Sequence, residues 1–526
     1  MASSADYVIV GSGINGLTCA ALLGKRGRRM LVLEREKVAG GCMRTEAITA
    51  PGYIHDVMAT TFVLFITSPA FAKLGPDLSR HGLDFAHSPN PTGVLLPDGR
   101  SLILSTNRAA NVARFNQVMD GEGDRFAADI DVVGREAGLL FGLLGGALWT
   151  WGTAKLLLGE ARRRGLRGLA ARLGEALISG RAWLETRYRA ELVRALLAPW
   201  VLHAGLGPES AFSGEIGRVI AFALEAAGAP VVKGGAGNAV AAFEGLIREQ
   251  GGEVRTNADV VEVVVSDGHA SGVRLASGEI VSAARGVISS VTPSQLYERL
   301  LAGSAVGGEP RERAKTYRYG KGNMQIHYAL KTPPRWRTPE LGSVALLHLT
   351  AGVDGVSRAV NECERGMLPA VPTICVGQPH ALDPSRCPDG AGIFWIQLPE
   401  APRVIKGDAA GTIMVGEDGR WTESVREAYA DRVEAILASH IDGFAENVVA
   451  RRAYSPADLE AININLVGGD PYGGACSIDQ FFIWRPFADS VNHRTPVAGL
   501  YHIGASTHPG PGLAGGSGFA LAERLT

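Results

Sequence analysis

A glycine-rich turn near the start of the chain limits the fold more than any other feature. Asp6–Val10 reads as a short buried strand, and Gly11-Ser-Gly-Ile-Asn-Gly16 follows it directly. A helix is expected from about Leu17 to Gly27, and a second buried strand at Met30–Leu33. In this setting the first glycine permits a tight turn, the second lets a pyrophosphate approach the backbone, and the third allows close helix–strand packing. The pattern predicts a dinucleotide-binding β-α-β unit; a glycine turn without a ligand is the alternative.

An acidic residue after the second strand narrows the choice of dinucleotide. Glu34 follows Leu33, where a carboxylate can accept hydrogen bonds from the ribose hydroxyls. The same carboxylate disfavours a 2′-phosphate, so NADP is not expected at this site. The glycine motif and Glu34 together do not separate FAD from NAD.

Three further segments favour FAD. Gly40-Gly-Cys-Met-Arg44-Thr45 can approach a cofactor closely and set a cation near its phosphates or flavin edge, although an ordinary surface turn is the alternative. The strand edge at Ala258–Val260 can pair its main-chain groups with an adenine ring. The segment Gly499–Gly518 again offers a strand, a glycine-rich loop and a helix start. A helix N-terminus aimed at the pyrimidine side of a flavin would stabilise the negative charge gained on reduction.

Charge and cysteine content exclude several classes of protein. The chain has 52 basic and 53 acidic side chains, so no overall basic field is available to hold nucleic acid. Its 6 cysteines include no C-x-x-C pair, so we expect no metal site and no redox-active dithiol. A long, cysteine-poor chain favours a reducing compartment, and the first residues lack the regions of a secretory signal. We therefore expect a cytoplasmic protein.

The order of predicted elements indicates an α/β protein. Strands and helices alternate at the N-terminus and again after the glycine-rich break at Pro230–Gly237, whereas residues 76–230 are increasingly helical. The other expected helices lie at 238–250, at 422–440 and from about 517. The other expected strands lie at 253–255, 260–265, 272–275, 287–290, 324–330, 393–398 and 500–503.

One uncharged segment has three interpretations. Residues 137–154 contain no charged side chain, and arginines cluster between 162 and 172. Several glycines lower the hydrophobicity of the segment, and a transmembrane span needs about 20 apolar residues. We expect a buried element or a lid over an apolar substrate cavity. Contact with the inner face of a membrane is the second interpretation, and a membrane span is the third.

Motifs spread from one end of the chain to the other form a recognisable set. They are Val8–Leu17, Leu33–Gly41, Thr45–Glu46, Pro51–Tyr53, Leu96–Arg100, Ala381–Ser385, Ser477–Gln480, Arg485–Pro486 and Gly504–Gly512. This set resembles the phytoene desaturase-related flavoproteins within the amine-oxidase-like FAD superfamily. The most similar branches are the desaturase-like carotene ketolases and the pyridine-nucleotide-disulfide-oxidoreductase-domain proteins. The motifs are specific for FAD and say little about the substrate.

The resemblance implies a Rossmann-like FAD-binding domain of the glutathione-reductase/amine-oxidase type with an inserted α+β substrate domain. On that basis we expect a FAD-binding domain of residues 1–75, 231–300 and 488–526, and a substrate domain of residues 76–230 and 301–487. The cofactor contacts expected are Gly11, Gly13, Asn15, Gly16, Glu34, Arg35, Gly41, Arg44, Val260, Gly504 and Ser517.

Two departures from the related sequences bear on the substrate. His508-Pro-Gly-Pro-Gly512 stands where related sequences have consecutive glycines, and Asp470-Pro-Tyr-Gly-Gly474 replaces a stretch often rich in His or Ile. Both changes would reshape the pocket near the flavin. The sequence contains no second strand–GxGxxG–helix unit, so no built-in NADPH domain is expected. Oxygen or a quinone would then accept the electrons.

Four side chains are candidates for catalysis near the flavin: His508, Tyr472, His55 and Asp479. His508 is the leading candidate because it lies in the terminal loop, and Tyr472 could polarise a carbonyl or act as an acid. Each has a structural alternative. The histidines could bond their own loops, Tyr472 could only pack, and Asp479 could pair with Arg485.

The sequence therefore predicts a FAD-dependent oxidoreductase that acts on CH–CH groups. A dehydrogenase or desaturase would move hydride from a carbon held about 3–3.5 Å from flavin N5. Its small substrate would be largely apolar, a cyclic ketone or a polyene. Flavin amine oxidation and carotene-ketolase-like oxygenation are alternatives with the same fold. A FAD-free lipid-binding escort protein is the non-enzymatic alternative, which the intact glycine motif and Glu34 argue against.

Overall fold

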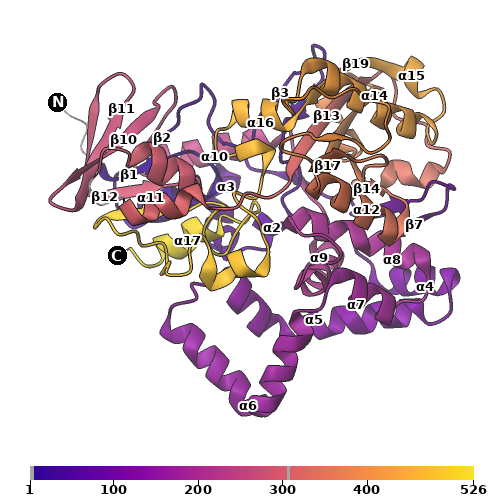
Figure 1. Cartoon of the computed structure of the whole chain (residues 1–526), viewed down its shortest axis with the longest axis horizontal. Coiled ribbons are helices and arrows are strands. Elements are labelled where there is room, and N and C mark those ends of the chain that lie inside the picture. Colours follow the sequence, from indigo (N-terminus) through magenta and orange to yellow (C-terminus); the bar gives the residue numbers. More distant parts are fainter. Residues whose placement is uncertain (1–4, 305–307, 526) are drawn as a thin grey trace.

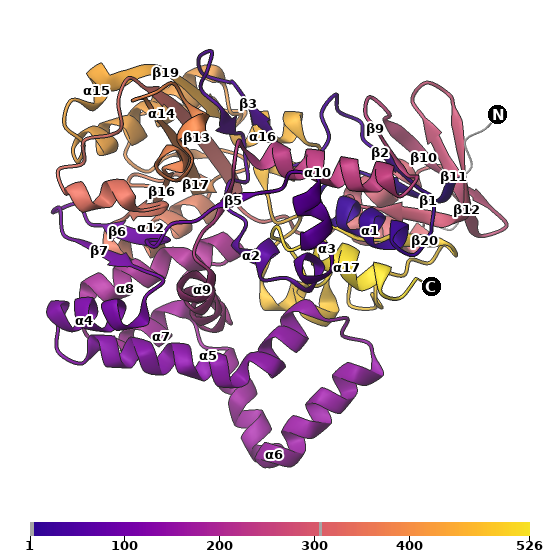
Figure 2. The same cartoon turned by 180° about the vertical axis from the view of Figure 1, so that it is seen from behind.

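A computed structural model describes residues 5–304 and 308–525 and divides them into two lobes (Figure 1). One lobe carries both ends of the chain and a mostly parallel sheet. The other is built on a second sheet, and helices α5 (Glu122–Gly145) and α6 (Trp151–Ala176) extend away from it (Figures 1 and 2). The strands of each sheet come from separated parts of the sequence, so the chain passes between the lobes repeatedly.

The N-terminal lobe has a seven-stranded sheet in the order β10-β11-β12-β1-β2-β9, with β20 beside β12. Its strands are β1 (Ala5–Val10), β2 (Met30–Leu33), β9 (Glu253–Arg255), β10 (Val260–Ser266), β11 (His269–Leu275), β12 (Ile280–Ser289) and β20 (Leu500–His502). β1 pairs in parallel with β2 and β12, and β12 pairs in parallel with β20. β1 and β2 are runs of buried apolar residues, as expected where helices cover both faces of a parallel sheet. The predicted Rossmann-like unit at the N-terminus is confirmed.

Helices cover both faces of this sheet. On one face lie α1 (Ile14–Gly24), α3 (Pro69–Arg80), α10 (Ala236–Glu249) and α17 (Gly516–Ala522). Leu17 of α1 and Phe243 of α10 share a core with Val32 on this face. On the other face, Leu31 shares a core with Leu296 of η2 (Ser294–Leu300) and with α11 (Gly308–Lys315). Helix α1 begins directly after Gly13, earlier than the sequence suggested, because the glycine motif itself supplies the N-cap.

β12 is longer than the sequence indicated. Only the stretch at 287–290 reads as a buried strand, but β12 already begins at Ile280. The first part of β12 pairs antiparallel with β11 and is alternately exposed, whereas the last part pairs with β1. The exposed part lacks an apolar run, so its cross-strand partners rather than its composition hold it in the sheet.

The second lobe has a seven-stranded sheet in the order β19-β13-β17-β16-β14-β6-β7, antiparallel except between β14 and β6. Its strands are β6 (Thr92–Leu95), β7 (Ser101–Leu104), β13 (Gly322–Leu330), β14 (Leu346–Leu349), β16 (Ile374–Gly377), β17 (Gly392–Ala401) and β19 (Val448–Tyr454). Met324 and Ile326 of β13 pack into a core with α14 (Glu423–Ala438), the amphipathic helix expected at 422–440. Because side chains alternate along a strand, Asn323 and Gln325 point to the opposite face.

The remaining elements are helices, short helical turns and two-residue ladders. The helices are α2 (Val63–Ile66), α4 (Arg108–Val118), α7 (Gly180–Arg187), α8 (Glu191–Leu197), α9 (Ser213–Ala227), α12 (Gly352–Glu364), α13 (Pro379–Leu382), α15 (Phe444–Asn447) and α16 (Pro456–Ile462). The 3₁₀ turns are η1 (Ala198–Ala204), η4 (Pro339–Ser343), η5 (Pro384–Arg386), η6 (Val467–Gly469), η7 (Ile478–Gln480) and η8 (Phe482–Trp484). The ladders are β3 (Thr45–Glu46) with β4 (His55–Asp56), β5 (Phe85–Ala86) with β8 (Val231–Val232), and β15 (Met367–Leu368) with β18 (Gly407–Asp408).

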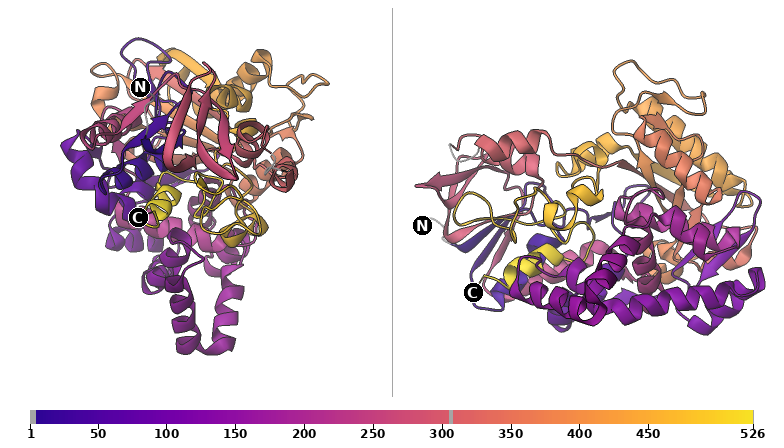
Figure 3. Two further views of the ribbon diagram at one scale, coloured as in Figure 1. Left: turned by 90° about the vertical axis from the view of Figure 1, so that its left-hand side faces the viewer. Right: turned by 60° about the horizontal axis from the view of Figure 1, so that its bottom comes forward.

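The uncharged segment 137–154 lies in the α5–α6 hairpin, of which only α6, bent at Gly165, projects away from both lobes (Figure 3). Leu139 and Leu140 are buried, but Phe141, Trp149 and Trp151 are 45%, 52% and 74% exposed. The interpretation as a buried element is therefore wrong for most of the segment, although Gly146 and Trp149 form hydrogen bonds with His508 and Asn492. Among the described residues, no helix has the length and apolar character needed to cross a bilayer.

Candidate functional site

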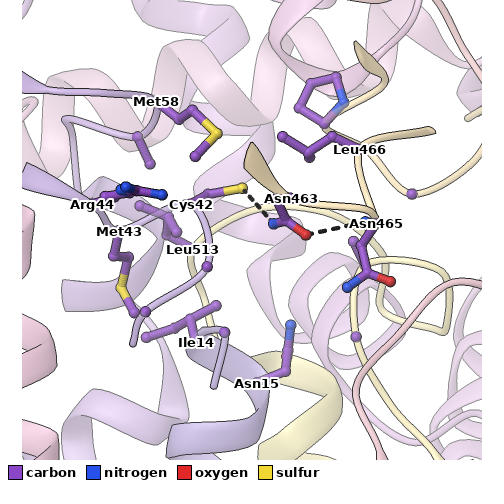
Figure 4. A pocket seen from close by; sticks show the side chains of 18 of the residues that line it. Ile14, Asn15, Cys42, Met43, Arg44, Met58, Asn463, Asn465, Leu466 and Leu513 are labelled. Atoms are coloured by element: carbon purple, nitrogen blue, oxygen red, sulfur yellow. Dashed lines mark hydrogen bonds between the residues drawn. The ribbon is translucent and has the colours of Figure 1, made fainter. Parts of the chain in front are cut away.

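A single cavity takes its lining from both lobes (Figure 4). The cavity has a volume of about 400 Å³. The glycine motif, Glu34 and the segment around Gly504 border one end. Strands β13 and β17 and the turn η1 border the other end. The cavity therefore joins the dinucleotide-binding motif to the sheet of the second lobe.

The start of α1 forms a cradle at the first end. Gly13 is the N-cap of α1, and no side chain caps the helix there. A Cβ atom added to Gly13 would meet nothing within 4 Å, so the space beside it is open. Uncapped main-chain N–H groups at a helix start favour a phosphate group. Gly16 has the packing role expected of it, because a Cβ there would lie 2.3 Å from the carbonyl oxygen of Gly11.

Glu34 is fixed at the edge of the cavity at the end of β2. Its Oε2 accepts hydrogen bonds from the main-chain N–H of Ser12 at 3.1 Å and from the Ser12 hydroxyl at 2.6 Å. Its Oε1 accepts one from the N–H of Glu36 at 3.0 Å. These bonds orient a carboxylate that is only 7% exposed, which fits recognition of a ribose hydroxyl.

The two termini meet beside the cradle. The Ser517 hydroxyl donates to Asn15 Oδ1 at 2.9 Å and accepts from the N–H of Gly504 at 2.8 Å. Asn15 and Gly504 line the cavity, whereas Ser517 lies behind them. Gly41 also lines the cavity and approaches the Cα of Gly13 so closely that a Cβ there would lie 3.3 Å away. Distant parts of the sequence thus build one narrow, glycine-lined edge.

The expected cations and the expected adenine contact also border the cavity. Arg44 pairs with Glu46, and Arg35 pairs with Glu36 at 3.2 Å. Val260 lines the cavity, but its carbonyl already accepts from Arg299 Nη1 at 3.0 Å. The open cradle, the fixed carboxylate and the flanking cations together fit a dinucleotide such as FAD.

The far wall carries amide side chains that sequence reasoning missed. Asn323 and Gln325 of β13 line the cavity, and Gln325 pairs across the sheet with Gln397 of β17. Asn323 and Gln325 are 1% and 3% exposed, yet Asn323 Oδ1 and Gln325 Oε1 have no hydrogen-bond partner among the described residues. The alternation Asn323-Met-Gln-Ile-His327 is the signal that could have revealed this polar face.

Aromatic rings complete this wall. Trp200, Trp395 and Tyr472 line the cavity, and the indole N–H of Trp395 donates to the carbonyl of Met58 at 2.8 Å. The hydroxyl of Tyr472 donates to the carbonyl of Leu202 at 2.7 Å. Burial, followed by nearby Cys476, raises the pKa of Tyr472 well above its usual value. Tyr472 therefore stays protonated and forms part of the wall.

The other three predicted catalytic residues do not line the cavity. His55 is buried against the His327 ring at 5.3 Å, and burial lowers its pKa to about 2. His508 shares a hydrogen bond of 2.9 Å with the carbonyl of Gly146 at the end of α5, and burial lowers its pKa to about 4. The structure thus brings Tyr472 alone of the four to the cavity.

Asp479 lies on the surface. Its side chain is 63% exposed and pairs with Arg318. The predicted pair with Arg485 is wrong, because Arg485 is buried and donates instead to the carbonyls of Tyr472 at 2.6 Å and Ala505 at 2.9 Å. Arg485 thereby ties the tyrosine segment to the C-terminal loop.

Known proteins resemble this chain along nearly its full length. The family described as NAD(P)-binding Rossmann-like domain matches residues 9–74. The mouse protein named pyridine nucleotide-disulfide oxidoreductase domain-containing protein 2 is 28% identical over 98% of this chain and 92% of its own length. The neurosporene-forming phytoene desaturase of Cereibacter sphaeroides is 25% identical over 99% of this chain and 94% of its own. A crystal structure of putrescine oxidase bound to putrescine has a TM-score of 0.58 at 17% identity, with 99% of each chain covered. The chain is therefore a relative of the phytoene desaturases and of the pyridine nucleotide-disulfide oxidoreductase domain-containing proteins, with the fold of amine-oxidase-type flavoproteins.

Proposed function

We propose that this chain is a FAD-dependent dehydrogenase or desaturase that removes two hydrogens from a carbon–carbon bond of a largely apolar substrate. The observation that supports it best is the single cavity that joins the glycine cradle to the wall of amides and aromatic rings. When bound, FAD would supply a two-electron oxidant, and oxygen or a quinone would take the electrons onward.

The chain itself would bind and orient. The start of α1 and Glu34 would hold the cofactor from one end, and the aromatic side chains Trp200, Trp395 and Tyr472 would exclude water from the other. Tyr472 is held protonated and bonded to a carbonyl, and His508 lies outside the cavity. Neither is therefore placed as a base, so the second hydrogen would leave as a proton to solvent water, and the proposed reaction depends chiefly on orientation of the substrate.

The amide wall favours a substrate that carries an oxygen atom, such as a cyclic ketone, over a bare polyene. A buried polar group left without a partner costs about 1–3 kcal/mol. Asn323 and Gln325 are such groups, and both line the cavity. A substrate hydroxyl could donate to Asn323 Oδ1 or Gln325 Oε1, and the NH2 groups of the same side chains could donate to a substrate carbonyl, whereas a hydrocarbon could do neither.

The alternative functions would require other side chains, another product or no cofactor. An amine oxidase would use a carboxylate to anchor the amine, but the lining carboxylates of the described residues, Glu34, Glu36 and Asp259, all belong to the N-terminal lobe. A ketolase-like oxygenation would place oxygen in the product, which isotopically labelled oxygen would reveal. A FAD-free escort protein would not need the open cradle at Gly13.

The test is anaerobic bleaching of the flavin by matched compounds: a cyclic ketone, the hydrocarbon of the same skeleton, and the corresponding amine. We expect bleaching by the ketone and a desaturated product. The variant Gln325→Leu should lower kcat/KM for the ketone by about 5–150-fold, the loss of about 1–3 kcal/mol. The exposed control Gln117→Leu should match the wild type. Bleaching by the amine alone would refute the proposal.

We also propose that the α5–α6 hairpin rests on an anionic membrane surface, from which an apolar substrate would enter. Trp151 and Leu166 are 74% and 80% exposed and lie on the two arms of α6, before and after its bend at Gly165. Lys155 and Arg162 are exposed on the first arm, and Arg167 on the second. Apolar side chains beside cations are typical of helices that lie in the headgroup region. The base of the hairpin also touches the cavity wall, because Phe141 packs on Phe222 of the wall helix α9 at 6.2 Å.

Flotation with vesicles tests this contact. The wild type should float with vesicles that contain anionic lipid, and high salt should weaken the association. The double variant Trp151→Ser/Leu166→Ser should lose it, whereas Met414→Ser, which alters an apolar side chain 91% exposed elsewhere, should not. Equal flotation of the two variants would contradict the proposed contact.

A further inference from the structure

Two histidines and a cysteine from separate segments lie close together behind Trp200 of the far wall. His348 of β14 and Cys375 of β16 are direct cross-strand partners, and Cys375 is also the cross-strand partner of Gln397 in the amide wall. His203 of η1 lies against them, with its Nε2 2.9 Å from Nε2 of His348. One ring nitrogen of each histidine and the thiol sulfur all lie within 4.8 Å of one another.

We propose that His203, His348 and Cys375 bind one zinc ion or one cuprous ion. Imidazole and thiolate are the ligands that both cations prefer. The inference stands apart from the flavin reaction, because it concerns side chains that the proposed function does not use.

The spacing of the three side chains fits one cation. Zinc lies about 2.0–2.1 Å from imidazole nitrogen and about 2.3 Å from sulfur, so tetrahedral ligands are separated by about 3.3–3.8 Å. The separations in the cluster lie on both sides of this range, from 2.9 Å to no more than 4.8 Å. Small rotations of the side chains would therefore bring all three to ligand distance.

Binding of the cation would also involve a proton. Zinc and cuprous ions bind a thiolate and neutral imidazole rings, so uptake of the cation would displace the proton of the Cys375 thiol and release it to solvent.

A simple hydrogen bond between the histidines does not account for the cluster. Only one proton can lie between the two Nε2 atoms, so the ring that does not carry this proton directs a lone pair into the cluster. A cation would use the Nε2 lone pairs of both rings together with the sulfur of Cys375.

The cluster borders the cavity through one of its three side chains. Trp200 packs against His203 at 4.7 Å and His348 at 5.0 Å between ring centroids. His203 and Trp200 line the cavity, whereas His348 and Cys375 are fully buried. A cation held by these three protein ligands would take its fourth ligand from outside the cluster.

Metal content tests the inference without any turnover. The full-length protein is stripped with a chelator, incubated with excess Zn²⁺ or with Cu⁺ under reducing conditions, desalted and analysed by mass spectrometry. We expect about one ion per chain. Competition with a coloured chelator should then show at least 100-fold weaker binding in Cys375→Ala. The matched control Cys363→Ala removes another buried thiol from the same lobe and should bind as the wild type does.

Each outcome decides the matter. The inference is overturned if the wild-type protein retains less than one-tenth of an ion per chain both after Zn²⁺ and after Cu⁺. This result needs no variant, so it holds even if every variant fails to fold. Equal affinity of the wild type and Cys375→Ala also overturns it, because the ion would then sit elsewhere. A parallel loss in His203→Gln, with unchanged thermal unfolding, supports it.

Discussion

Alanine at two glycines of the same motif should weaken FAD binding in both cases but lower the stability in only one. At Gly16 a methyl group would lie 2.3 Å from the main-chain oxygen of Gly11, which cannot rotate away. Alanine gains about 1 kcal/mol in helix propensity, but overpacking against backbone costs about 1–3 kcal/mol or more. Because the 2.3 Å contact is with backbone, we expect the upper end of this cost, so that Gly16→Ala loses about 2 kcal/mol of unfolding free energy. It should also bind FAD weakly, because the turn at Gly11 must move.

At Gly13 the methyl group would meet no protein atom, and the backbone angles of φ −63° and ψ 169° are allowed for alanine. Alanine is a poorer N-cap than glycine, which lowers the free energy of unfolding, but it also reduces the conformational entropy of the unfolded chain, which raises it. The two effects cancel to within about 1 kcal/mol. The methyl group would, however, occupy the space into which we place the pyrophosphate. Gly13→Ala should therefore keep the stability of the wild type and bind FAD at least 10-fold more weakly, about 1.4 kcal/mol.

Urea unfolding of the FAD-free proteins gives the stabilities, and quenching of flavin fluorescence gives the affinities. Equal FAD affinity of Gly13→Ala and wild type, within twofold, would refute the reasoning about the cradle. A fully stable Gly16→Ala would refute the reasoning about packing.

Three more predictions concern single side chains. Glu34→Gln should weaken FAD binding by about 10–100-fold, because charge-assisted hydrogen bonds contribute about 1.5–3 kcal/mol; fluorescence titration measures it, and an unchanged affinity would remove Glu34 from the site. Arg432→Met removes two hydrogen bonds of 2.8 and 2.7 Å from Asp408, whose side chain is 1% exposed; urea unfolding should show a loss of about 3–5 kcal/mol, and a loss below 1 kcal/mol would contradict the estimate. Burial lowers the pKa of His327 to about 3, so its stabilising effect is complete above the unfolded pKa of about 6.5 and is lost as the pH falls toward 3. Between pH 7 and pH 5 the free energy of unfolding should therefore fall more steeply in the wild type than in His327→Gln, and the two slopes should differ by up to about 1.4 kcal/mol per pH unit. Parallel curves would contradict this.

The parts of the site that could be predicted are local in sequence. Gly11, Gly13 and Gly16 act within one turn, and Glu34 follows the strand that positions it. Each of these residues needs only its immediate neighbours to have its role, so the residue types and their spacing identify it. The same holds for α14, whose apolar face repeats with the period of a helix.

The far wall could not be predicted because it depends on the register between strands. Gln325 and Gln397 are far apart in the sequence and meet only because β13 pairs with β17. His348 and Cys375 meet through the pairing of β14 with β16. Alternation along one strand indicates which side chains share a face, but not what that face meets.

His508 shows the same limit in a loop. Its position in the glycine-rich terminal segment suggested the flavin edge, yet the loop directs the ring to the carbonyl of Gly146 in the hairpin. The ring also stacks on Phe482 at 6.1 Å. Long-range contacts of this kind decide where a loop side chain points.

The central claim is that glycine-lined segments from both ends of the chain hold one FAD. The most direct test is to incubate the purified protein with FAD, FMN, NAD and NADP together and to remove unbound nucleotide by gel filtration. The bound nucleotide is then released with acid and identified by chromatography. We expect one FAD per chain, with the other nucleotides absent after gel filtration. A protein that retains no nucleotide, or that retains a nicotinamide nucleotide in place of FAD, would contradict it.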